Sequence, residues 1–370
     1  MQGLLGARRG GGVSLLLVLL LHLQLGSSTC PCHDPSLCKP ISGNRDFEVF
    51  VFDVGETTWK FYDWSKITTV AAFGKYDPEL MCYAHSKGAR VVFKGDISVK
   101  KIVSPAARAA WIGQQVKLAK KRYMDGLNID FEQEVNKSSA EYNALTDLVK
   151  ETTEAFHKEI PGSQVTFDIG WFPECIETRC YNYSGIADSC DFVFVMSYDE
   201  PSQVWSNCTL RGNAPYPQTI AGYDNYLLMG IHPKKLVMGV PWYGYDYTCR
   251  HLSKDNVCSF AKNPLQGAQC SYTGGNQVPY SIIMKQARNS SSGILWDKVQ
   301  KVPYLEYKDS HNASHQVWFD NPRSISLKAA YVKEHGLRGI GMWNGNCLDY
   351  SGDSLAQEQT KAMWEVLKPK

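Results

Sequence analysis

The chain has 370 residues, of which 44% are hydrophobic and 21% charged, an ordinary composition for a globular protein with room for one large domain. Its formal net charge of +2 gives no reason to expect nucleic acid or an anionic membrane as a partner. The 20 tyrosines and 10 tryptophans suit a well-packed core, and they equally suit platforms for sugar rings.

The first 29 residues have the three parts of a secretory signal peptide. Arg8 and Arg9 precede the apolar run VSLLLVLLLHLQL (13–25), and small residues follow it. The run is short for a membrane span and has no stop-transfer flank, although a signal anchor is the alternative. We therefore predict a signal peptide over 1–29 and a mature chain over 30–370 that enters the secretory route. No other stretch is long and apolar enough to span a membrane.

All twelve cysteines lie after this segment, and an even number in a secreted chain indicates disulfides. The sequence leaves their pairing open. Their spacing does not match a zinc site and no histidine cluster accompanies them, so we predict neither a metal nor a cofactor. Five N-x-S/T sequons are candidate glycosylation sites and mark surface loops: Asn136, Asn182, Asn207, Asn289 and Asn312.

Short apolar runs alternate with helical patterns along the mature chain. Eight runs predict strands, at 47–56, 67–77, 89–98, 125–133, 164–173, 191–200, 235–247 and 337–346. Ser104-Pro105 predicts the start of a helix, with Ser as N-cap and Pro in the first turn. Ser138 and Glu141 match a capping box for a second helix.

Near-continuous apolar strands separated by helices predict a parallel sheet, and eight such units favour a (β/α)8 TIM barrel. An open doubly wound sheet is the rival, but no glycine-rich phosphate loop follows the first strand. The stretch 249–320 is too long for one helix and contains the strand-like segments GILWDKV, PYLEYKD and HQVWFDN. We predict a small α+β insertion there, between strands seven and eight.

The fourth strand, DGLNIDFEQ, carries polar side chains at every second position. Asn128, Asp130 and Glu132 therefore share one face, where their desolvation is unfavourable. A buried network that fixes strand register is one explanation. The other is catalysis, because a barrel's active site lies at the carboxyl ends of its strands, and a carboxylic acid with a raised pKa there can protonate a leaving oxygen. The other strand ends are rich in carboxylates, Tyr and Trp, which favours a carbohydrate pocket.

Several motifs resemble family 18 glycoside hydrolases, the chitinase family. D-G-x-x-x-D-x-E on the fourth strand is similar to the family signature, and the insertion falls where the family carries one. Met196-Ser197-Tyr198-Asp199, Pro241-Trp242-Tyr243-Gly244 and Trp343 match elements of strands six, seven and eight. Two positions depart from the pattern: Asn128 replaces the first Asp of D-x-D-x-E, and Val92-Phe93-Lys94-Gly95-Asp96 replaces S-x-G-G.

This resemblance implies a substrate-assisted retaining mechanism, in which the N-acetyl group of the substrate is the nucleophile. It implies Glu132 as proton donor, Asp130 as partner of the acetamide N–H and Tyr198 as donor to its carbonyl. Trp343, Phe52 and Tyr243 are expected to bind substrate. We expect Asn128 to orient Asp130 by a hydrogen bond and Asp199 to support the site. Four residues also have a purely structural alternative. Tyr198 could be a core residue and Asp199 a helix or loop cap, and Trp171 and Trp242 could serve only in packing.

With these two departures and its cysteine-rich N-terminus, the chain most resembles a lysosomal, exo-acting member of the family. That resemblance implies a monomer that cleaves chitobiose-core oligosaccharides from the reducing end, with no nucleic-acid or membrane partner. An endo-acting chitinase and a non-catalytic chitooligosaccharide-binding lectin remain alternatives. Lectins on this barrel usually lack the acid Glu, which is present here as Glu132.

Overall fold

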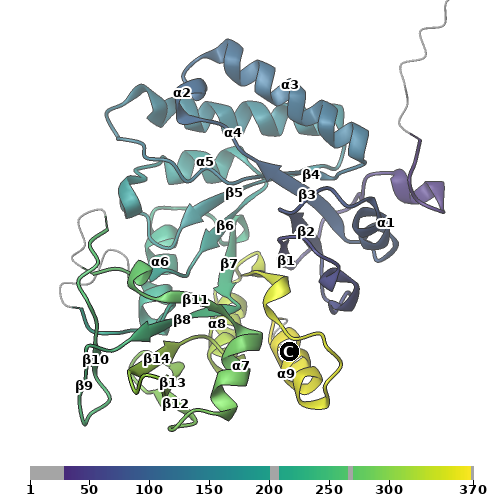
Figure 1. Ribbon diagram of the computed structural model, residues 1–370. Coiled ribbons are helices and arrows are strands. Elements are labelled where there is room, and N and C mark those ends of the chain that lie inside the picture. The colour runs from purple at the N-terminus through teal and green to yellow at the C-terminus, as the bar shows by residue number, and fades with distance from the viewer. Residues whose placement is uncertain (1–28, 201–207, 266–269, 368–370) are drawn as a thin grey trace, which may run out of the picture.

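The computed structural model describes residues 29–200, 208–265 and 270–367. Within them the chain forms a closed parallel barrel with the strand order β1-β15-β7-β6-β5-β4-β3-β2 (Figure 1). Its strands are β1 (Glu48–Asp53), β2 (Thr69–Ala72), β3 (Arg90–Gly95), β4 (Gly126–Ile129), β5 (Gln164–Gly170), β6 (Phe192–Met196), β7 (Leu236–Pro241) and β15 (Gly339–Trp343). The predicted (β/α)8 barrel is confirmed.

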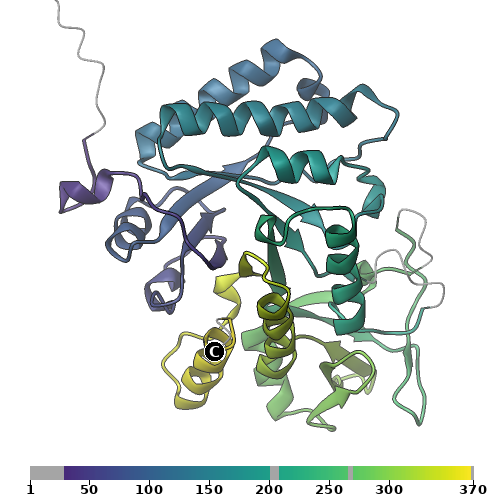
Figure 2. The same cartoon turned by 180° about the vertical axis from the view of Figure 1, so that it is seen from behind.

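Helices cover the outside of the barrel. Figure 1 shows α3, α4 and α5 side by side along one flank, and Figure 2 shows the same layer from behind. The barrel helices are α1 (Pro78–Ser86), α2 (Val99–Ile102), α3 (Pro105–Arg122), α4 (Ala140–Glu159), α5 (Tyr183–Ser189), α6 (Tyr216–Leu228), α8 (Pro322–Glu334) and α9 (Ser354–Glu365). In the part of the chain that the structure describes, no helix combines the length and apolar character needed to cross a membrane.

Helix α3 begins where the sequence predicts. The Ser104 hydroxyl accepts a hydrogen bond from the Ala107 N–H at 3.3 Å, and Pro105 occupies the first turn. Helix α4 instead has Ser139 as its N-cap, so the predicted capping box of Ser138 and Glu141 is wrong. The reason is local, since the Ser138 hydroxyl and N–H both donate to the side chain of Asn136, which begins the turn that precedes α4.

A second, antiparallel sheet packs beside the barrel and has the order β11-β8-β14-β13-β12. Its elements are β8 (Tyr243–Thr248), β11 (Asn276–Pro279), α7 (Tyr280–Arg288), β12 (Ile294–Asp297), β13 (Val302–Lys308) and β14 (Ser314–Trp318), with the two-stranded ribbon β9 (His251–Leu252) and β10 (Cys258–Ser259) beside it. The three strand-like segments of the predicted insertion are β12, β13 and β14.

The predicted strand 235–247 is two strands, which is a correction. The barrel strand β7 ends at Pro241, and β8 starts at Tyr243 in the second sheet, so that sheet begins before the predicted boundary at 249. Between them, the Trp242 N–H donates to the carbonyl of Trp343 at 2.9 Å. Proline lacks the N–H that continues a strand ladder, so the chain changes sheets here although its apolar pattern continues.

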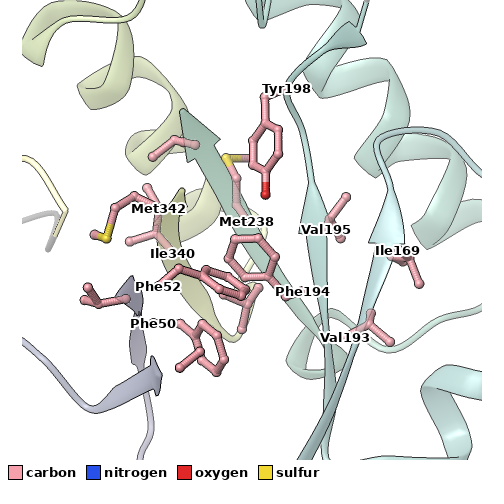
Figure 3. Packing of buried hydrophobic residues seen from close by; sticks show 14 of the residues in the cluster. Phe50, Phe52, Ile169, Val193, Phe194, Val195, Tyr198, Met238, Ile340 and Met342 are labelled. Carbon is pink, nitrogen blue, oxygen red and sulfur yellow. The ribbon is translucent and has the colours of Figure 1, made fainter. Parts of the chain in front are cut away.

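Aromatic rings fill the barrel interior. Phe194 lies 5.6 Å from Phe50 and 4.8 Å from Phe52, measured between ring centroids, and Figure 3 shows these rings clustered between the strands. Gly239 and Gly341 make room for them, because a Cβ at either position would lie within 2.8 Å of the Phe194 ring. The interior is therefore a packed core, and only its upper end can take a ligand.

Five disulfides join ten of the twelve cysteines: Cys30–Cys38, Cys32–Cys82, Cys175–Cys180, Cys208–Cys270 and Cys249–Cys258. Cys190 and Cys347 are buried as free thiols, where burial raises the pKa of each to about 12 and about 11. The sulfur atoms of Cys30, Cys32 and Cys38 lie within 4.8 Å of one another. All three are in disulfides, which leaves no thiolate there for a metal.

Candidate active site

A cavity of about 220 Å³ opens at the carboxyl ends of the barrel strands. Its wall includes seven of the site residues predicted from the sequence: Phe52, Asp130, Glu132, Tyr198, Asp199, Tyr243 and Trp343. Gln277 of β11 and Tyr272, from the short 3-10 turn just before that strand, complete the wall. Another cavity, of about 550 Å³, shares Asp130 and Glu132 with the first. The two carboxylates thus stand between two adjoining spaces.

Each of these carboxylates contacts a cation. Strand β4 ends at Ile129, and the next residues keep its alternation, so Asp130 and Glu132 both reach the barrel mouth. Lys94 Nζ lies 2.9 Å from Asp130 Oδ2, and Arg179 Nη1 donates to Glu132 Oε2 at 2.7 Å. The Asp130 side chain is 11% exposed and that of Glu132 is 49% exposed, so Glu132 is the more accessible.

Asn128 lies beneath the cavity and is fully buried. Its amide N–H groups donate to Thr166 Oγ1 at 2.9 Å and to Asp168 Oδ1 at 2.8 Å. Both donors are therefore used on β5, and the expected orienting hydrogen bond from Asn128 to Asp130 is not formed, which corrects the sequence-based interpretation. The Asn128 carbonyl oxygen, also buried, has no hydrogen-bond partner in the described structure.

Burial and mutual repulsion act on the carboxyls of this column. Burial, together with the charge of Asp130, raises the pKa of Asp168 well above its usual range. Desolvation by the cavity walls and the charge of Asp130 also raise the pKa of Glu132, and Arg179 opposes this rise. Neighbouring carboxyls with different environments suit acid–base work, because one can hold a proton while another stays ionised.

A tyrosine-rich wall lies on the opposite side of the cavity. Asp199 Oδ1 accepts hydrogen bonds from the hydroxyls of Tyr243 at 2.7 Å and Tyr245 at 2.9 Å. Burial nevertheless raises the pKa of Asp199 to about 6. Burial also raises the pKa of Tyr198, whose hydroxyl therefore stays protonated and can donate. Tyr198 is buried as the core alternative requires, yet it also lines the cavity, and Figure 3 shows it above the barrel core.

Aromatic side chains form the floor. Trp343 is the last residue of β15. Its ring centroid lies 5.3 Å from that of Phe52 and 5.8 Å from that of Phe73. Trp171 also lines the cavity. Trp242 does not; it is fully buried and packs edge-to-face on Trp364, so it has a packing role.

Four charged residues of the site, Asp168, Lys94, Glu177 and Arg179, were not predicted as site residues from the sequence. The sequence did contain a signal for Asp168. Thr166 and Asp168 are polar residues two positions apart on β5, as Asn128 and Asp130 are at the end of β4. Lys94 was noticed only as a departure from a motif. Arg179 gave no signal, because its place depends on the loop closed by Cys175–Cys180, and pairing was not readable from the sequence.

Four of the five sequons lie in described residues. Asn136, Asn289 and Asn312 are exposed, and Asn182 is half-buried, with its side-chain oxygen capping α5 at the N–H of Gly185. Asn207 lies outside the described residues, as does the predicted signal peptide up to residue 28.

A barrel of this topology with acidic residues at the end of its fourth strand defines a class of glycosidases, and comparison with known proteins gives the same class. The model of the glycosyl hydrolases family 18 matches residues 57–346. The chain belongs to this family and is a glycoside hydrolase.

Close relatives and more distant structures are consistent with this assignment. The chain is 67% identical to di-N-acetylchitobiase of Mus musculus over 355 residues, which covers 96% of this chain and 97% of that one. It is also 67% identical to di-N-acetylchitobiase of Homo sapiens over 349 residues, 94% of this chain and 91% of that one. A plant class V chitinase mutant from Cycas revoluta, solved with (GlcNAc)3, shares the fold with a TM-score of 0.68 at 20% identity, covering 86% and 99% of the two chains.

Proposed function

We propose that this chain hydrolyses the β1,4 bond between the two N-acetylglucosamine units of the chitobiose core of N-linked oligosaccharides, acting from the reducing end. One observation carries the proposal: Asp130, Glu132 and Tyr198 converge with Trp343 on one small cavity. The 67% identity to proteins named di-N-acetylchitobiase supports this substrate.

The chemistry needs no nucleophile from the protein. The acetamide carbonyl oxygen of the bound sugar attacks its own anomeric carbon as the bond to the leaving oxygen breaks. Glu132 gives its proton to that oxygen, and an oxazolinium ion remains. Glu132, now a carboxylate, then takes a proton from water, which adds to the anomeric carbon and restores the acetamide with retained configuration.

The observed contacts divide the supporting roles. Because Lys94 holds Oδ2 of Asp130, the other oxygen is left to accept the acetamide N–H and to stabilise the oxazolinium charge. The Tyr198 hydroxyl donates to the attacking carbonyl oxygen. Trp343 and Phe52 stack beneath the sugar, and Tyr243 lines the opposite wall, held by its bond to Asp199.

The sizes of the two cavities favour short products. The cavity at the barrel mouth, at about 220 Å³, is below the range of about 300–1,000 Å³ typical of ligand pockets, which suits a single reacting sugar. The leaving sugar would occupy the adjoining cavity, where Trp111 is available as a platform.

Reducing-end-labelled tri-N-acetylchitotriose tests this function at acidic pH. Labelled monosaccharide as the first product supports cleavage from the reducing end. Labelled disaccharide as the main early product would instead indicate an ordinary chitinase or a non-reducing-end enzyme. Binding without cleavage would favour the lectin.

We propose the lysosome as the site of action. A predicted signal peptide and exposed sequons at Asn136, Asn289 and Asn312 support entry into the secretory route and glycan attachment. Immunofluorescence of the full chain beside a lysosomal marker tests this location. Recovery of the protein only in the medium would contradict it.

A further inference from the structure

A short disulfide-closed loop delivers a cation to the general acid. The loop follows β5 and is closed by Cys175–Cys180. It carries Arg179, whose Nη1 donates to Glu132 at 2.7 Å while Nη2 donates to Glu177 in the same loop. The Arg179 side chain is 10% exposed, whereas that of Glu132 is 49% exposed.

The loop is fixed on several sides, so this cation cannot readily swing away. Arg179 forms a parallel β-bridge with Val135, and its carbonyl accepts the hydroxyl of Tyr183 at 2.7 Å. Tyr272, in the short 3-10 turn before β11, donates to Glu177 at 3.3 Å, which links the loop to the other wall of the cavity. The guanidinium remains charged throughout, because Glu132 and Glu177 raise the pKa of Arg179 despite its burial.

We propose that Arg179 is a positioning residue which, shared between Glu132 and Glu177, confines protonation of the general acid to acidic pH. The proposal rests on the function proposed above for Glu132. Arg179 favours the carboxylate of Glu132, both at rest and after the proton has passed to the leaving oxygen. Glu177 offsets part of that effect, since it competes for the same guanidinium and adds a negative charge of its own.

Other groups facing Glu132 act in known directions. The titratable and charged neighbours besides Arg179 and Glu177 are Lys94 from β3, Asp130 beyond β4, Asp168 from β5, Tyr181 after the loop, and Tyr198 and Asp199 beyond β6. Removing a neighbouring cation must raise the pKa of Glu132, and removing a neighbouring anion must lower it. Replacing Arg179 and replacing Glu177 should therefore shift the pKa of Glu132 in opposite directions.

Titration of the Glu132 carboxyl by ¹³C NMR tests the proposal without any substrate, with the resonance assigned by its loss in Glu132→Gln. Arg179→Met should move the midpoint up by about 1 pH unit or more, and Glu177→Gln should move it down by a smaller amount. Arg179→Lys should restore most of the wild-type midpoint. Unchanged midpoints in Arg179→Met and Glu177→Gln, or shifts of the same sign, would overturn the proposal, and Glu177→Gln alone decides it if Arg179→Met does not fold.

Hydrolysis of di-N-acetylchitobiose by the same variants gives the second readout. The basic limb of the kcat/KM profile should follow the NMR midpoint in each variant. An arginine that merely holds the loop together would lower activity equally at every pH. If the wild type cleaves no chitooligosaccharide while the NMR midpoints shift as predicted, the proposed substrate is wrong and the charge pairing stands.

Discussion

Asn128→Asp would convert a hydrogen-bond donor into a second buried carboxyl. Asn128 Nδ2 now donates to Asp168 Oδ1 across 2.8 Å. Two full charges at that separation repel by about 6 kcal/mol at an effective dielectric of 20, so the pair cannot ionise completely. The added carboxyl would have a folded-state pKa above its unfolded value of about 4. It should destabilise the fold increasingly as pH rises, by up to about 1.4 kcal/mol per pH unit above pH 4.

Urea unfolding at pH 4.5 and pH 7 measures this effect. We expect the variant to lie close to wild type at pH 4.5 and to be less stable by about 3 kcal/mol or more at pH 7. Asn44→Asp, which adds the same charge at an exposed position, should show no such trend. The reasoning fails if Asn128→Asp has the same unfolding deficit at both pH values.

Four further variants test buried charges and disulfides of the fold. Asp125→Ala removes a buried carboxylate with three hydrogen bonds at 2.7 Å, and should lower the urea unfolding free energy by about 3–5 kcal/mol; a loss below 1 kcal/mol would contradict this. Burial raises the pKa of Asp199 to about 6, so wild type should lose about 2 kcal/mol relative to Asp199→Asn between pH 4 and 6.5, and a constant difference argues against it. Opening Cys32–Cys82, which spans 50 residues, should lower the free energy of unfolding by about 4 kcal/mol, and opening the much shorter Cys175–Cys180 loop by about 2 kcal/mol. Equal decreases in melting temperature for the two variants would contradict this.

The barrel was predictable because its information is local. Each strand is a short apolar run, and the polar alternation of Asn128, Asp130 and Glu132 indicated the end of β4 whose side chains line the cavity. The end of β7 was harder, since the apolar pattern runs through Pro241 into β8 and only the missing N–H of proline marks the change of sheet.

The rest of the site depends on long-range contacts. Asp168 meets Asn128 only because β5 pairs with β4 in one particular register. Arg179 reaches Glu132 from a loop whose shape depends on a disulfide and on a bridge to Val135. Neither the register nor the pairing follows from residue spacing alone, so the cation beside each carboxylate could not be read from the sequence.

The central claim is that Glu132 is the general acid of a chitooligosaccharide hydrolase. The most direct measurement is the rate of di-N-acetylchitobiose hydrolysis by wild type and Glu132→Gln at acidic pH, with disaccharide binding to each followed by calorimetry. We expect the variant to bind the disaccharide but to cleave it about 10²–10⁴-fold more slowly. Cleavage by Glu132→Gln at the wild-type rate would contradict the claim.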